Sequence, residues 1–125
     1  MKNYAIELND RPFKAILAGT KKVEGRTPED ESDKRYDEMA LGDTITFTNN
    51  ITNEQMVVEV VFVHKYSDVR TMLETEGTKN VLSSGLDVEG GIKSYNSLEG
   101  YEERIKKFGI YAIGVSVVAE NNMAA

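Results

Sequence analysis

A short charged segment, residues 19–28, holds the side chains of this sequence that are best suited to chemistry. It reads GTKKVEGRTP, so Lys21, Glu24 and Arg26 lie close together along the chain. An arginine suits two-point contact with a phosphate or a carbonyl group, because its N–H groups form a planar fork. A buried lysine has a lowered pKa and can polarise a bound group or carry a proton. Glu24 can hold either cation in place, or act as a general base on a bound water.

The same segment also fits a plain surface strand. Strand alternation places Lys22, Glu24 and Arg26 on one face, while Lys21 stands at the strand's start and can turn to either face. Alternating charges commonly pair across a solvated surface, where such pairs contribute little to stability. The two interpretations, a binding cleft and a solvated strand, differ in whether these side chains meet in one hollow.

Two further groups of residues raise the question of a metal site. His64 is the only histidine, so it cannot form a histidine-rich site, and we expect a structural role for it. An acidic run lacks the regular alternation and the fixed glycine of a calcium-binding EF-hand loop, and we expect it to be a solvated loop. This run consists of Glu29, Asp30, Glu31, Asp33, Asp37 and Glu38. The sequence therefore predicts no metal and no cofactor.

Tyrosines could contribute base stacking to a cleft, as aromatic residues do in single-strand recognition. Tyr95, between Ser94 and Asn96, is the candidate for this role. We expect Tyr101 and Tyr111 to pack in the core instead.

Basic residues near the end of the last predicted helix form a patch. They fit the favourable interaction of cations with a helix C-terminus, and a phosphate-tracking surface is the alternative. The patch consists of Arg104, Lys106 and Lys107.

The pattern of apolar residues predicts the elements that position these side chains. Strands are expected at residues 2–8, 21–26, 44–49, 55–66 and 108–118. Helices are expected after Asn9 or Asp10 up to Gly19, then over 67–76 with Ser67 as the N-terminal cap, 78–83, 87–98 and 100–107. The strand over 55–66 carries valines on both faces, which indicates burial on two sides. Five strands with helices in these places describe an α+β domain around a small mixed barrel.

Length and composition limit the classes of protein. A chain of 125 residues fits one domain, and 40% hydrophobic with 29% charged residues is ordinary for a globular protein. No apolar run is long enough to cross a bilayer, and the charged N-terminal segment does not fit an export signal. Since the sequence also lacks cysteine, we expect a cytoplasmic protein with no membrane partner and no disulfide partner. The formal net charge of −6 argues against a general RNA coat and favours a small or short ligand.

The spacing of residues around the charged segment resembles that of a known family. The pattern F-x-x-I-x-x-G-x-K-x-x-E-x-R over residues 13–26, followed by G-D-x-I-x-F over 42–47, is similar to the ASCH domain of the PUA-like superfamily. The resemblance continues through 57–66, 67–76 and the run GIYAI at 109–113. It extends over residues 3–118, and we expect residues 119–125 to form a disordered tail.

The resemblance implies a PUA-like mixed β-barrel of five to six strands with flanking helices. It also implies that the G-x-K-x-x-E-x-R segment lines a cleft that binds RNA, a nucleotide or a nucleoside. Some members of the family are enzymes: one branch removes the acetyl group from acetylcytidine, and a ribonuclease activity belongs to another.

The acetylcytidine branch has a threonine nucleophile three residues after the lysine, and this sequence has Glu24 there. A carboxylate cannot replace a hydroxyl that forms an acyl ester, and neither Thr20 nor Thr27 matches the pattern. The downstream glutamate that donates a proton in that branch has no motif here. The open candidates are Glu74, Glu76, Asp87 and Glu89.

These observations lead to a hypothesis of binding: Lys21, Glu24, Arg26 and Tyr95 recognise a nucleobase or phosphate of RNA or of a nucleotide. The enzyme alternative is hydrolysis of an acylated nucleoside or of RNA, with Glu24 as the base and Lys21 stabilising the oxyanion. A domain that serves only to bind a protein partner is the third class. The sequence leaves the oligomeric state open.

Overall fold

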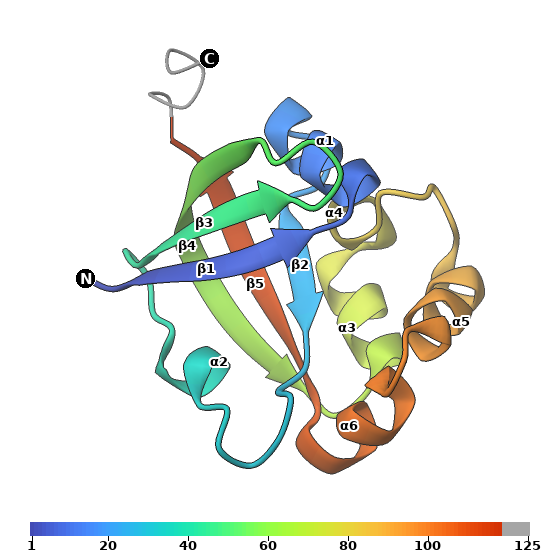
Figure 1. The fold of residues 1–125 in the computed structure, drawn as a ribbon. Coiled ribbons are helices and arrows are strands. Elements are labelled where there is room, and N and C mark those ends of the chain that lie inside the picture. The colour runs from blue at the N-terminus through green and yellow to red at the C-terminus, as the bar shows by residue number, and fades with distance from the viewer. Residues whose placement is uncertain (119–125) are drawn as a thin grey trace.

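The computed structural model describes residues 1–118, and its centre is one curled, five-stranded sheet (Figure 1). Hydrogen bonds join the strands in the order β1-β3-β4-β5-β2. The strands are β1 (Asn3–Leu8), β2 (Val23–Arg26), β3 (Thr44–Asn49), β4 (Gln55–Tyr66) and β5 (Ile110–Val117). Only β1 and β3 pair in parallel. The expected α+β, PUA-like architecture is confirmed, with the sheet forming a half-barrel whose two edge strands are β1 and β2. The predicted tail over 119–125 lies outside the described residues.

Six helices flank the sheet in the part of the chain that the structure describes. They are α1 (Asp10–Ala18), α2 (Arg35–Glu38), α3 (Val69–Glu76), α4 (Thr78–Val81), α5 (Val88–Ser97) and α6 (Tyr101–Phe108). Figure 1 shows α3, α5 and α6 gathered on one side of the sheet, next to the edge formed by β2. None of the helices within residues 1–118 is long and apolar enough to cross a membrane.

Helix α1 follows the local signals of its sequence. Pro12 stands in the first turn, where its missing N–H is not needed. Phe13 and Ile16 are buried, whereas Leu17 remains 40% exposed. Gly19 ends the helix in the left-handed region at φ 82°, and its N–H donates to the carbonyl of Ile16 at 3.0 Å. This turn leads the chain directly towards β2.

The cap of α3 differs from the prediction. Asp68, and not Ser67, accepts a hydrogen bond from the Thr71 backbone N–H, at 2.7 Å. The two polar residues are adjacent, and the cap must accept from an N–H of the helix's first turn. Because α3 begins at Val69, Asp68 occupies the N-cap position. The Ser67 hydroxyl donates to the Asp68 carboxylate instead.

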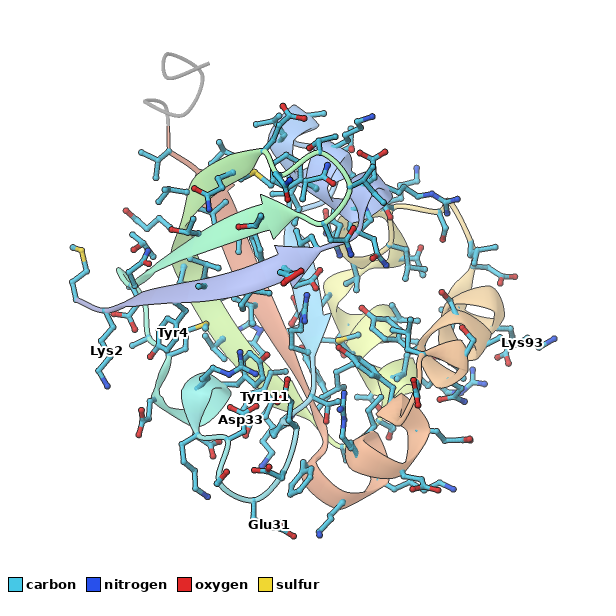
Figure 2. All side chains as sticks on the ribbon, viewed as in Figure 1. Lys2, Tyr4, Glu31, Asp33, Lys93 and Tyr111 are labelled. Atoms are coloured by element: carbon cyan, nitrogen blue, oxygen red, sulfur yellow. The ribbon has the colours of Figure 1, made fainter. Side chains whose placement is uncertain are left out.

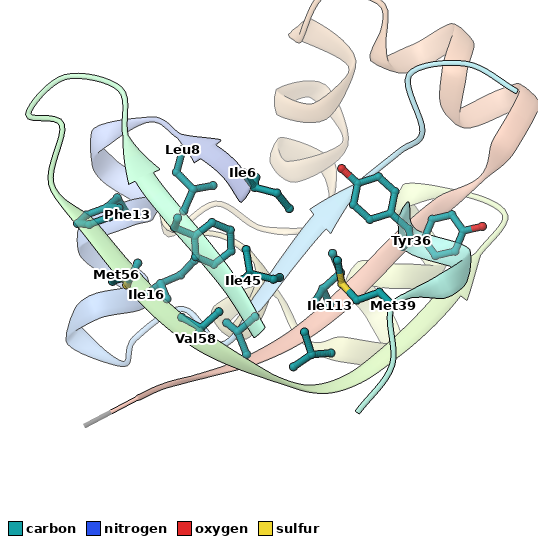
Figure 3. Packing of buried hydrophobic residues seen from close by; sticks show 14 residues of the cluster. Ile6, Leu8, Phe13, Ile16, Tyr36, Met39, Ile45, Met56, Val58 and Ile113 are labelled. Carbon is teal, nitrogen blue, oxygen red and sulfur yellow. The ribbon is translucent and has the colours of Figure 1, made fainter. Parts of the chain in front are cut away.

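Two hydrophobic clusters hold the domain together. The first lies inside the curl of the sheet, and Figure 3 shows it closed at one end by Tyr36 and Met39. Tyr111 is buried in this cluster, as predicted. The second cluster packs the helices against β2 and β5 through residues such as Met72 and Leu73 of α3.

Strand β4 only partly fits the expectation of burial on both faces. Val58 and Val60 are completely buried, but Val61 is 38% exposed. Burial alternates along this part of the strand, so Val61 lies on the face opposite Val58 and Val60; the pairing with β5 is irregular between Val60 and Phe62.

The acidic segment forms a surface loop around α2, as predicted. Asp33 forms an ion pair with Arg35 at 2.9 Å, and this interaction lowers the pKa of its carboxyl to about 2. Figure 2 shows Glu31 and Lys93 extending away from the body of the protein. No group of three or more His, Asp or Glu side chains within residues 1–118 is arranged to hold a metal ion.

Candidate functional site

A cleft of about 600 Å³ lies where the open side of the half-barrel meets the helices. Its walls come from the end of β1, the start of α1, strand β2, and the segments around α4, α5 and α6. This volume falls within the range of small-molecule sites, roughly 300–1,000 Å³. Lys21, Glu24, Arg26 and Tyr95 all line it.

Lys21 is buried at the floor of the cleft, with 4% of its surface exposed. Its ammonium donates to the carbonyl oxygens of Val23, at 2.6 Å, and of Val81. It also lies 3.3 Å from Oε1 of Glu24. Burial lowers the pKa of Lys21 and the Glu24 carboxylate opposes this effect. Since all three partners are acceptors and the ammonium has three N–H bonds, Lys21 has no donor left for a ligand.

Glu24 is held between two cations. One carboxylate oxygen faces Lys21, and the other accepts from Nε of Arg26 at 2.8 Å. Burial alone would raise the pKa of the Glu24 carboxyl, but the attraction of Lys21 and Arg26 lowers it overall. Glu24 is therefore an ionised carboxylate with only 7% of its surface exposed.

Arg26 joins the two edges of the sheet. Its Nη2 donates to the backbone carbonyl of Glu7, at 2.8 Å, so a side chain of β2 bridges to the end of β1. Tyr101 lies near Arg26, whose positive charge opposes the rise that burial causes in the pKa of the tyrosine. Burial alone would lower the pKa of Arg26, but the attraction of Glu24 raises it overall, so the guanidinium stays charged. Arg26 thus closes the open side of the half-barrel beside the cleft.

Gly25 presents the bare backbone of β2 to the cleft. Strand β2 is an edge strand that pairs only with β5. The Val23 carbonyl points to the unpaired side of β2, where it accepts from Lys21. Gly25 is two residues further along the strand, so its N–H and C=O groups point to the same unpaired side. The Tyr95 hydroxyl lies against the Gly25 backbone. A Cβ at Gly25 would lie 2.4 Å from the Tyr95 oxygen, which is closer than atoms can approach. Only glycine fits at this point of the strand.

Two aromatic rings line the wall opposite β2. Tyr95 and Tyr101 stack with a centroid separation of 6.3 Å and an interplanar angle of 24°. Burial raises the pKa of both hydroxyls, so both are neutral donors. Tyr101 packs against the second hydrophobic cluster, as expected, and its side chain also lines the cleft.

Lys22 does not lie in the cleft with Glu24 and Arg26, although strand alternation predicts the same face for all three. It is exposed and lines a shallower hollow between α1 and β5, because the strand begins only at Val23. Regular alternation therefore does not extend back to residue 22. The backbone N–H of Lys22 donates to the Asn80 carbonyl, at 2.8 Å, which connects β2 to α4.

The downstream acids that the sequence left open do not line the cleft. Glu74 and Glu89 are ion-paired with Arg70, and Asp87 caps α5. Glu76 accepts hydrogen bonds from the Tyr66 hydroxyl and pairs with His64 at 2.7 Å. All four carboxylates have structural partners instead.

Sequence reasoning missed several residues of the cleft. Gly25 could have been found, because an isolated glycine within a strand pattern marks a close approach of another group. Glu7, Arg11 and Leu98 reach the cleft only through the tertiary arrangement, and no local pattern marks them.

Fold and site together define a small PUA-like half-barrel with a cleft beside its open edge. The model of the ASCH domain family matches residues 6–119, and the chain belongs to this family. The family is linked in general to RNA binding and, in part, to hydrolase activity. Comparison with curated proteins gives no match.

Solved structures agree with this assignment. The chain is 34% identical to the hypothetical protein PH0355, with a TM-score of 0.78 over 93% of this chain and 99% of that one. It is 31% identical to the protein PF0455 from Pyrococcus furiosus, with a TM-score of 0.71 over 94% of this chain and 98% of that one. A mutant of ZmASCH from Zymomonas mobilis shares the fold at 19% identity, with a TM-score of 0.57 over 92% of this chain and 68% of that one.

Proposed function

We propose that the cleft binds the base of a nucleotide or of a short RNA segment, with Glu24 as the charged group that recognises it, beside the β2 backbone at Gly25. The supporting observation is the buried carboxylate. Each carboxylate oxygen can accept two hydrogen bonds, and each oxygen of Glu24 faces one cation. The remaining capacity suits the N–H groups on the edge of a base, as carboxylates accept from cytosine amino groups elsewhere.

The roles of the two cations change from the initial hypothesis. Lys21 fixes Glu24 and α4, because all its donors are occupied within the protein. Arg26 also has protein partners for its Nε and Nη2 atoms, so its task towards the ligand is to keep Glu24 ionised and correctly oriented. Tyr95 and Tyr101 provide a flat wall for the ring of a base.

The same arrangement favours binding over hydrolysis. A general base needs a pKa near the working pH, and the pKa of Glu24 is lowered. An oxyanion needs free donors, and Lys21 has none.

Titration calorimetry with the four common ribonucleosides and a short single-stranded RNA tests the proposal. Glu24→Gln should weaken binding at least about tenfold, since a charged acceptor is worth about 1.5–3 kcal/mol. Ser94→Trp, which adds bulk at an exposed position of the cleft wall, should block binding without disturbing the charged network. Glu54→Gln, exposed in the turn between β3 and β4, is the matched control and should leave affinity unchanged.

Two results would contradict the proposal. The first is absence of binding to all of these probes, and the second is binding that survives both Glu24→Gln and Ser94→Trp. Incubation with acetylcytidine and with RNA, followed by mass spectrometry of the products, examines the enzyme alternative. Turnover that Glu24→Gln abolishes would replace binding by hydrolysis as the function of the cleft.

A further inference from the structure

The arginines of this acidic protein divide into two groups. Arg26, Arg35 and Arg70 each form an ion pair with a carboxylate. Arg11 and Arg104 form no such pair within residues 1–118, although acidic residues outnumber basic ones in the sequence. Arg11 lines the cleft, and Arg104 packs over Tyr101, which also lines it.

Arg11 lies directly on the rim of the cleft. It is exposed in the first turn of α1 and lines the opening beside Asn9. The neighbouring Asp10 carboxylate is occupied elsewhere, since it accepts from the Asn49 amide at 2.9 Å and pairs with Lys14 at 3.2 Å. The guanidinium of Arg11 is therefore free to meet a ligand at the opening.

Arg104 adds positive charge behind the aromatic wall. Its guanidinium lies over the ring of Tyr101, 4.9 Å from the ring centroid, and Tyr101 lines the cleft. The Nε of Arg104 is buried without a hydrogen-bond partner. Arg104 thus carries its charge beside Tyr101 and forms no ion pair with a carboxylate within residues 1–118.

Carboxylates on the same rim limit how much negative charge a ligand can bring. Glu7 and Glu99 both line the cleft. With these two carboxylates and the net charge of −6, a polyanion would be repelled as it approaches. Arg11 can pair with one phosphate group, whereas the further phosphates of a triphosphate would add negative charge beside these carboxylates.

We propose that the ligand carries a single phosphate monoester, bound by Arg11 at the rim while the base lies against Glu24 and Gly25. This inference rests on the proposed function. Arg11 supplies a charge-assisted, two-point contact to the phosphate, and Arg104 strengthens it through its charge alone. A free nucleoside monophosphate and the phosphorylated end of a short RNA share this chemistry.

Calorimetry with matched pairs of ligands tests the proposal. The probes are the four common ribonucleosides, their 5′-monophosphates and 5′-triphosphates, and a trinucleotide with and without a 5′-phosphate. The wild-type protein should bind one monophosphate at least about tenfold more tightly than its nucleoside, and the triphosphate no more tightly than the monophosphate. The trinucleotide pair distinguishes an RNA end from a free nucleotide as the source of the phosphate.

Arg11→Gln isolates the phosphate contact. It should reduce the preference for the monophosphate to less than about threefold, while the affinity for the nucleoside stays the same. Lys14→Gln removes the same charge from the next turn of α1, outside the cleft, and should preserve the preference. Arg104→Gln should reduce the preference by a smaller factor than Arg11→Gln. Arg11 is exposed, so Arg11→Gln leaves the packed core intact. Arg104 is partly buried over Tyr101, so urea unfolding of Arg104→Gln accompanies its binding measurement.

The possible failures are distinguishable. Equal affinity for nucleoside and monophosphate in the wild type, or a preference that Arg11→Gln leaves intact, overturns the phosphate proposal while base binding stands. Tighter binding of triphosphates also overturns it. Failure of all nucleosides and nucleotides to bind overturns both this inference and the proposed function.

Discussion

The buried ammonium of Lys21 offers a direct test of the charged network. Lys21→Met keeps the length of the side chain and removes its charge and all three N–H donors. The carbonyls of Val23 and Val81 then have no partner from residue 21, and Glu24 loses one of its two cations. Removal of one member of a buried ion pair costs about 3–5 kcal/mol. A small domain has about 5–15 kcal/mol of stability in total, so this single change should remove a large part of it.

Urea unfolding followed by circular dichroism measures this loss. The midpoint should fall while the slope of unfolding free energy against urea stays the same, because the surface exposed on unfolding is unchanged. Lys22→Met is the control. This lysine is exposed, and its replacement should change stability by less than about 0.5 kcal/mol.

A double variant, Lys21→Met with Glu24→Leu, separates the ion pair from the carbonyl contacts. The double variant leaves only Arg26 without its carboxylate, whereas Glu24→Leu alone leaves both Lys21 and Arg26 unpaired. The combined loss should therefore fall short of the sum of the single losses by at least about 1 kcal/mol. Additive losses would refute the argument that the pair acts as a unit. A cost below about 1 kcal/mol for Lys21→Met alone would show that the three acceptors do not depend on the ammonium.

Three further changes test other parts of the structure. Gly25→Ala should displace Tyr95, lower stability by about 1–3 kcal/mol and abolish ligand binding, as measured by urea unfolding and calorimetry; an unchanged protein would refute the close contact. Asp68→Ala should cost about 1 kcal/mol through loss of the cap of α3, whereas Ser67→Ala should cost less than about 0.5 kcal/mol in the same unfolding assay. Asp43 accepts backbone hydrogen bonds that lower its pKa below the usual 3.8, so its stabilising effect is present above that value and is lost as the pH falls through the folded-state pKa. Wild type should therefore exceed Asp43→Asn in stability at about pH 7 and lose this advantage at about pH 2.

The elements of the fold follow closely from local sequence patterns. The pattern of apolar residues predicts all five strands, and Gly19 and Gly77 end their helices as expected. The differences occur at element ends, where local signals compete. Ser67 and Asp68 are both suitable caps, and only the packing of α3 decides between them.

The candidate site likewise has features that the local sequence predicts and features that only the tertiary arrangement determines. The types and spacing of Lys21, Glu24 and Arg26 predict a charged group on β2, because neighbours in a strand stay close in space. No local pattern reveals that Lys21 is satisfied by the carbonyl of Val81, which belongs to another element. Its residue type and position therefore suggest a lysine that polarises a ligand, whereas its ammonium contacts three acceptors within the protein.

The pairing of β2 determines when the cleft can form during synthesis. Among the strands, β2 pairs only with β5, where residues 23–26 face residues 111–114, so β2 has no strand partner until the end of the chain has been made. At the ordinary pace of translation the segment waits for several seconds in water, with its charged side chains hydrated. These charged side chains lose their water only in the last stage of folding, when β5 pairs with β2. A chain truncated before β5 therefore lacks the paired strand that forms one wall of the cleft.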